Sequence, residues 1–247
     1  PAARAALERA LAIDEKTFGA EHPNVAVDVN NLGLVYLAIG DLSAARAAFE
    51  RALAIDEKSF GADHPNVARA VNNIGLVHKD IGNLPAARDA FERAITIGEK
   101  SFGIEHPQVA IFVNNIGSVY HDMGALPAAR VAYERALAIK EKTFDADHSS
   151  VAISVNNLGL VYQDMGDLPA ARAAYERALA IFEKALGTDH PNVATLVNNL
   201  GSVYSAMGDL PKARAHYQRA LVIMEKYAPS NPNTKAARRN LERVSRR

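Results

Sequence analysis

An Asn-Asn pair recurs five times along the chain, and it is the repeated motif best suited to binding chemistry. The motif reads Asn-Asn-(Leu or Ile)-Gly, and its copies lie 42 residues apart at 30–33, 72–75, 114–117, 156–159 and 198–201. Asn is a mediocre helix former because its side chain competes with the backbone for hydrogen bonds, so adjacent Asn residues inside a helix need a reason. A side-chain amide both donates and accepts, so a column of amides can hold the peptide bonds of an extended ligand.

The five Asn pairs define two columns of amides, one made of the first Asn of each pair and one made of the second. The second Asn of each pair gives the first set of candidate ligand-binding residues, which are Asn31, Asn73, Asn115, Asn157 and Asn199. The first Asn of the pair adds Asn72, Asn114 and Asn156 as candidates. The structural alternative is that one or both amides bond to neighbouring repeats and set the spacing between them.

Residues typical of enzymes and metal sites do not form a recognisable pattern. Five histidines occur once per repeat, at His22, His64, His106, His148 and His190. Equivalent positions in adjacent repeats should lie roughly 10 Å apart, as packed helices do, so these side chains cannot share one metal ion. We interpret them as structural residues at helix starts. There is no glycine-rich phosphate loop, His-Glu-x2-His motif, nucleophile elbow or EF-hand loop. We therefore predict no enzyme, no cofactor and no metal.

Composition narrows the class of protein further. The 247 residues include 28 Lys+Arg and 28 Asp+Glu, which argues against a nucleic-acid or anionic-membrane partner because such binders carry a basic surplus. No stretch approaches the roughly 18–20 apolar residues that cross a bilayer. The absence of Cys excludes disulfides and thiolate zinc sites and suits a reducing compartment, which favours a cytoplasmic location. The chain begins at Pro1 rather than Met, as is typical of a fragment.

Each repeat reads as two helices. In the first full copy, residues 24–39 carry apolar side chains at the i, i+3 and i+4 spacing of a helix with one buried face, and Gly40 can end it. Residues 43–60 form the second helix, with Asp41 as a candidate N-cap. No alternating strand pattern or hairpin signal is present. The fold class is predicted to be all-α.

The pattern within each repeat resembles the tetratricopeptide repeat. The residues that carry the resemblance are Leu32-Gly33, Tyr36, Ala45, Phe49 and Ala52. The period is 42 rather than 34 residues, and this variety with Asn-Asn-Leu-Gly is similar to the repeats of kinesin light chains and related bacterial arrays. The resemblance implies a right-handed α-solenoid, a superhelix of helix-turn-helix repeats, as one domain over residues 1–247. Its expected parts are a half repeat (1–21), five full repeats (22–63, 64–105, 106–147, 148–189 and 190–231) and a capping helix (232–247).

The resemblance also implies a function. In similar proteins, Asn residues on the first helices line a concave groove and clasp the main chain of a peptide. By the same analogy the groove takes Arg69, Ile111, Ile153, Lys79 and His121. We expect a non-enzymatic scaffold that binds an extended peptide or a segment of a partner protein. The mixture of Arg69, Lys79 and His121 with Asp residues is nearly neutral, so the acidic peptides bound by kinesin light chains are not carried over.

Two other hypotheses remain open. In the first, the array is a structural element that self-associates, because Leu7, Leu11 and Ile13 of the first half repeat lack a preceding partner helix. This would give a homo-oligomer through exposed repeat ends. Alternatively, the chain is the sensor segment of a larger signalling ATPase or adaptor protein, to which similar arrays are often attached.

Overall fold

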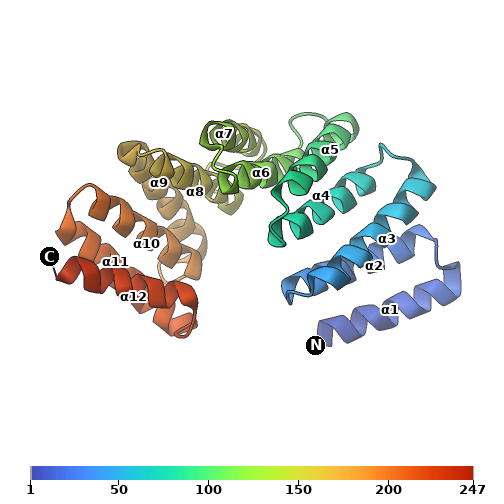
Figure 1. The fold of residues 1–247 in the computed structure, drawn as a ribbon, viewed down its shortest axis with the longest axis horizontal. Coiled ribbons are helices and arrows are strands. Elements are labelled where there is room, and N and C mark those ends of the chain that lie inside the picture. Colours follow the sequence, from blue (N-terminus) through green and yellow to red (C-terminus); the bar gives the residue numbers. More distant parts are fainter. Residues whose placement is uncertain (1, 247) are drawn as a thin grey trace. The chain divides into compact units, whose positions relative to one another are not determined.

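The computed structural model describes residues 2–246, except for the side chain of Ala2, and over this range it is entirely helical apart from turns (Figure 1). Its twelve helices are α1 (Ala2–Phe18), α2 (Pro23–Ala38), α3 (Leu42–Phe60), α4 (Pro65–Asp80), α5 (Leu84–Phe102), α6 (Pro107–Asp122), α7 (Leu126–Thr143), α8 (Ser149–Asp164), α9 (Leu168–Leu186), α10 (Pro191–Ala206), α11 (Leu210–Tyr227) and α12 (Pro232–Ser245). The prediction of an all-α solenoid of two-helix repeats is confirmed, with helix bounds within one residue of those expected for the first copy.

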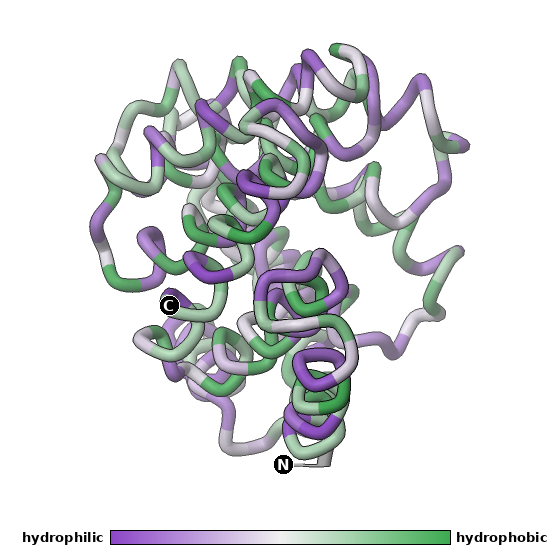
Figure 2. The backbone as a smooth tube through the Cα atoms, turned by 90° about the vertical axis from the view of Figure 1, so that its right-hand side faces the viewer, coloured by the Kyte–Doolittle hydropathy of each residue, from purple (hydrophilic) through white to green (hydrophobic). Residues whose placement is uncertain are grey.

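The helices form two compact units, with α1–α6 in residues 1–125 and α7–α12 in residues 126–247. In the first unit α2 pairs with α3 and α4 with α5, and each pair packs on the next helix along the chain. In the second unit the pairs are α8 with α9 and α10 with α11, with α12 packed on α11. Figure 2 shows hydrophobic and hydrophilic residues mixed along the same helices, as expected for helices with one buried face. That residues 1–247 form one domain stays a prediction.

Capping residues set where the helices begin. Each of the five repeat histidines is the N-cap of a first helix, where its Nδ1 accepts the backbone N–H two residues later, at 3.2 Å from Asn24 in the case of His22. Four of these rings also stack on a phenylalanine at the end of the preceding helix or one residue beyond it, as His64 does on Phe60 with 4.2 Å between ring centroids. Asp41 caps α3 by accepting the N–H of Ala44 at 3.1 Å. The histidines therefore hold helix starts in place, as the sequence indicates.

Glycine in the middle of the first helix lets the two helices of a repeat approach closely. The rings of Phe49, Phe91, Tyr175 and Tyr217 are fully buried, and each lies against a glycine of the paired first helix. A Cβ atom placed on Gly33 would be 2.5 Å from Cε1 of Phe49. The Leu-Gly spacing of the motif is thus a packing requirement, since only a residue without a side chain leaves room for the ring.

A second position, here called the junction position, decides how one repeat meets the next. It lies on the second helix, and its occupants are Asp14, Asp56, Gly98, Lys140, Phe182 and Met224. At Gly98 a Cβ atom would lie 3.0 Å from Cε2 of Phe112 on the next helix. At Lys140 the buried Nζ donates to Oγ of Ser154 at 2.8 Å and to the carbonyl of Ser150 at 3.2 Å. The side-chain contacts at the junction therefore differ from repeat to repeat, although the helix pattern is the same.

Candidate binding groove

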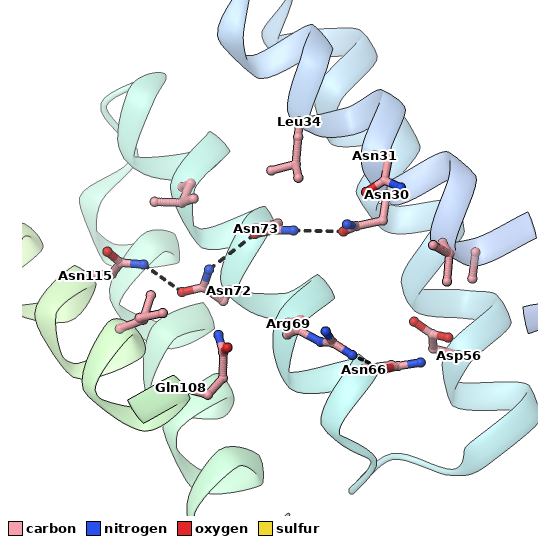
Figure 3. A pocket seen from close by; sticks show the side chains of 14 residues that line it. Asn30, Asn31, Leu34, Asp56, Asn66, Arg69, Asn72, Asn73, Gln108 and Asn115 are labelled. Atoms are coloured by element: carbon pink, nitrogen blue, oxygen red, sulfur yellow. Dashed lines mark hydrogen bonds between the residues drawn. The ribbon is translucent and has the colours of Figure 1, made fainter. Parts of the chain in front are cut away.

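A groove of about 550 Å³ runs over the first helices of the first unit (Figure 3). Its lining comes from α2, α4 and α6, with one residue, Asp56, contributed by α3. Six of the residues predicted from the sequence lie in it, namely Asn31, Asn72, Asn73, Asn115, Arg69 and Ile111. The helix spacing thus brings residues 42 positions apart in the chain to one surface.

The other predicted residues lie elsewhere. Asn114, Lys79 and His121 belong to the first unit but are outside the lining described for the groove. Nζ of Lys79 lies 3.6 Å from Oδ2 of Asp122, which is on α6. The remaining predicted residues, Ile153, Asn156, Asn157 and Asn199, are on α8 and α10 of the second unit.

The paired asparagines hydrogen-bond to one another and form what we call the Asn ladder. Nδ2 of Asn115 donates to Oδ1 of Asn72 at 2.8 Å, Nδ2 of Asn72 donates to Oδ1 of Asn73 at 3.3 Å, and Nδ2 of Asn73 donates to Oδ1 of Asn30 at 2.8 Å (Figure 3). The second Asn of one repeat therefore bonds the first Asn of the preceding repeat, which gives the pair the structural role that the sequence left open.

The same rule holds in the second unit, where Nδ2 of Asn199 donates to Oδ1 of Asn156 at 3.3 Å. A side-chain amide has two N–H donors and an oxygen with two lone pairs, so one ladder bond at each end does not exhaust its capacity. The ladder amides of the groove keep the hydrogen-bonding capacity that the ligand hypothesis needs.

Replacing Asn73 by Ala should lower the free energy of unfolding by about 1–2 kcal/mol, because Oδ1 of Asn30 and Nδ2 of Asn72 would each lose a partner in a partly buried setting. The matched control is Asn31→Ala. Asn31 occupies the same column, but residues 1–29 contain no Asn pair to which it could bond. Urea unfolding of both variants measures the difference, and equal losses would contradict a structural role for the ladder.

Apolar side chains flank the ladder amides. Val27, Leu34 and Ile111 line the groove and are 52%, 42% and 44% exposed, respectively. Large apolar side chains this exposed and gathered at one hollow are typical of a site that another molecule covers.

Four polar residues of the groove were not among the candidates, namely Asn30, Asp56, Asn66 and Gln108. Asp56 is 6% exposed, and its Oδ1 has no hydrogen-bond partner among the residues that the structure describes. Burial raises the pKa of its carboxyl, while a hydrogen bond with Asn66 and the charges of His64 and Arg69 act to lower it. Asp56 lies at the junction position. The residue type at this position differs from repeat to repeat, and this variation is the sequence signal that could have identified Asp56.

Within residues 2–246, no three His, Asp or Glu side chains gather so as to hold a metal ion. None of the described helices is both long and apolar enough to span a bilayer. What the groove does combine is fixed amides, exposed apolar side chains and one buried carboxylate.

Comparison with solved structures shows the fold. BtubC (BKLC) from P. vanneervenii is 24% identical with a TM-score of 0.79, over 93% of this chain and 92% of that one. A putative kinesin light chain of nearly identical TPR-like repeats from Podosopora anserina is 24% identical with a TM-score of 0.69, over 85% and 99% of the two chains. RapI in its apo form is 17% identical with a TM-score of 0.70, over 81% and 70%. A comparison with curated protein sequences finds no match.

Sequence comparison reaches the same result without the structure. Six overlapping segments match the family model of the tetratricopeptide repeat, at residues 1–58, 30–100, 66–142, 108–184, 149–226 and 193–247. The fold of this family is typical of protein-interaction scaffolds, which are generally not enzymes. The chain belongs to the tetratricopeptide repeat family.

Proposed function

We propose that this chain is a non-enzymatic protein-interaction module that binds an extended segment of a partner protein in the groove over α2, α4 and α6. The observation that carries the proposal is the groove itself, where amides held by the Asn ladder alternate with exposed apolar side chains. Amides suit the main chain of any peptide, and the apolar side chains suit alternate side chains of an extended one.

The dimensions favour a short linear segment. Packed helices lie about 10 Å apart, so three first helices offer roughly 20 Å of surface. An extended peptide rises about 3.3 Å per residue, so about six residues contact the groove. The ladder supports binding in a further way, since amides already held in place lose little conformational freedom when a ligand arrives.

Blocking the groove should strongly reduce the capture of peptides from a random library of nine-residue peptides. Ile111→Arg places a long charged side chain among the ladder amides, and we expect it to reduce capture at least tenfold. Ile104→Arg is the matched control, because Ile104 is exposed in the link before α6 and lies outside the groove lining. Equal capture by both variants would show that peptides bind elsewhere, and no capture by the unmodified chain would contradict the proposed function.

Self-association remains a second candidate, favoured by one observation. Ile13 and Phe18 of α1 are exposed, whereas Leu11 packs against the cluster around Val25 and Val29. The uncovered face of α1 is therefore narrower than the sequence indicates. A homo-oligomer, a role as the sensor segment of a larger protein and a cytoplasmic location all stay predictions.

A further inference from the structure

The groove contains a carboxylate that the Asn ladder does not use. We propose that Asp56 receives a basic side chain of the bound segment, a lysine ammonium or an arginine guanidinium, so that the ligand is an extended peptide with a positive charge over the junction of α3 and α4. The inference rests on the proposed function and names the chemical class of the ligand.

The carboxylate lies in the groove but has an incomplete set of partners. It is one of the residues lining the groove, it is more than nine-tenths buried, and its Oδ1 has no hydrogen-bond partner within the described chain. Asn66 hydrogen-bonds to the carboxyl, but a buried carboxylate oxygen that no donor reaches is costly, because water no longer solvates its charge. A cation that reaches the unpartnered oxygen from the groove offsets this cost through a charge-assisted hydrogen bond.

The fold itself does not require an acid here. The junction position is charged at Asp14 and Lys140 but is Gly98, Phe182 or Met224 in the other repeats, and Phe182 belongs to the apolar core of the second unit. Apolar residues therefore satisfy the packing of a junction. Packing does not require an acid at position 56, and what points to a ligand-binding role is that Asp56 lines the groove with an unpartnered oxygen.

The cation nearest in the groove is already engaged. Nη2 of Arg69 donates to Oδ1 of Asn66, so the guanidinium is held by an amide, and Asn66 separates Arg69 from Asp56 in the close view (Figure 3). Neither Asn66 nor Arg69 hydrogen-bonds to Oδ1 of Asp56, which is buried and without a partner among the described residues. The apolar Val27, which lines the same groove, offers a surface for the aliphatic stem of a Lys or Arg side chain.

A position-fixed peptide library tests the proposal. Nine-residue peptides, acetylated and amidated to remove terminal charges, carry Lys, Arg, norleucine or Glu at one fixed position and random residues elsewhere. We expect the unmodified chain to prefer Lys or Arg over norleucine by about tenfold at one position. Asp56→Asn should reduce this preference to less than twofold while retaining the norleucine peptides. Asp89→Asn changes the net charge equally on the exposed face of α5 and should leave the preference intact.

The outcomes separate the two proposals. If peptides bind with no preference for a basic residue, or if the preference survives Asp56→Asn, the assignment of Asp56 is overturned and the peptide-binding function stands. If the preference appears only with free N-termini, the cation recognised is the α-ammonium group rather than a side chain, which also overturns the assignment. Should Asp56→Asn fail to fold, Asp56→Met replaces it, because Met224 is a natural occupant of the junction position.

A small probe tests the carboxylate without any peptide. Addition of n-butylammonium to the chain labelled with ¹³C at the Asp side-chain carboxyls should shift the Asp56 signal, and 1-butanol at the same concentration should not. Absence of a shift with the ammonium ion, together with absence of a basic preference in the library, overturns the proposal. A shift in the absence of any peptide binding supports the cation site and contradicts only the proposed peptide-binding function.

Discussion

Gly159→Ala is expected to lower the free energy of unfolding by about 3 kcal/mol, at the upper end of the usual range for overpacked cores. The added Cβ atom would lie 2.5 Å from Cε1 and 2.7 Å from Cδ1 of Tyr175. The Tyr175 ring is fully buried and cannot move aside without displacing α9 from α8. Urea denaturation followed by circular dichroism measures the loss.

The control for this prediction is Gly98→Ala. There the added Cβ would meet the Phe112 ring at 3.0 Å, a contact that a small shift relieves. Because Ala is about 1 kcal/mol better than Gly inside a helix, the two effects should nearly cancel. A loss at Gly98 as large as that at Gly159 would mean that ring contact is not what excludes a side chain from the Leu-Gly motif. In Gly159→Ala/Tyr175→Leu, where no ring remains to clash, the combined loss should be smaller than the sum of the single losses.

Lys140→Met should raise the free energy of unfolding by about 2 kcal/mol at pH 7, because it removes a buried charge from the junction between α7 and α8. Lys140 is 6% exposed, and burial lowers the pKa of its ammonium to about 8. Methionine is the natural occupant of the same position at Met224, so its shape suits the junction. Adding Ser154→Ala avoids leaving Oγ of Ser154 without its partner.

The advantage of this variant should depend on pH. The unfolded chain holds the Lys140 proton up to its ordinary pKa of 10.5, whereas the folded chain releases it near pH 8. Below pH 8 the folded state therefore carries the full cost of a buried charge, and between pH 8 and 10.5 the unmodified chain regains stability. The difference between Lys140→Met and the unmodified chain should shrink from pH 7 to pH 9.5. Lys184→Met, at an exposed residue, is the control, and a constant difference for Lys140→Met would contradict a buried, shifted ammonium.

The helical repeat could be predicted from the sequence because its signals are local or periodic. The Asn-Asn-Leu-Gly spacing, the capping His22 and Asp41 and the terminal Gly40 each act within a few residues of their position. Six of the candidate site residues line the groove because the signal is periodic: equivalent positions of the first helices face the same side in every repeat.

The parts that were missed depend on contacts between repeats, which a single repeat does not reveal. The sequence shows that Asn73 is unusual inside a helix but does not show that its partner is Asn30, a residue of another repeat. Asp56 lies on a second helix and reaches a groove otherwise lined from first helices, so a search confined to first-helix columns does not find it. Comparing the copies at every position, rather than only along the predicted groove, would have singled it out.

The junction position also bears on how such a chain can change in evolution. Nearly identical coding repeats invite recombination that deletes or duplicates a 42-residue segment. Loss of residues 57–98 would keep the helix pattern but would join Asp56 directly to residue 99 and place its carboxylate opposite Phe112, where Gly98 now makes room for the ring. The repeats share the same helix pattern, but the residue at each junction position fits the residues of the repeat that now follows it. A change in the number or order of repeats would therefore bring mismatched residues together at a junction, even though each repeat taken alone resembles the others.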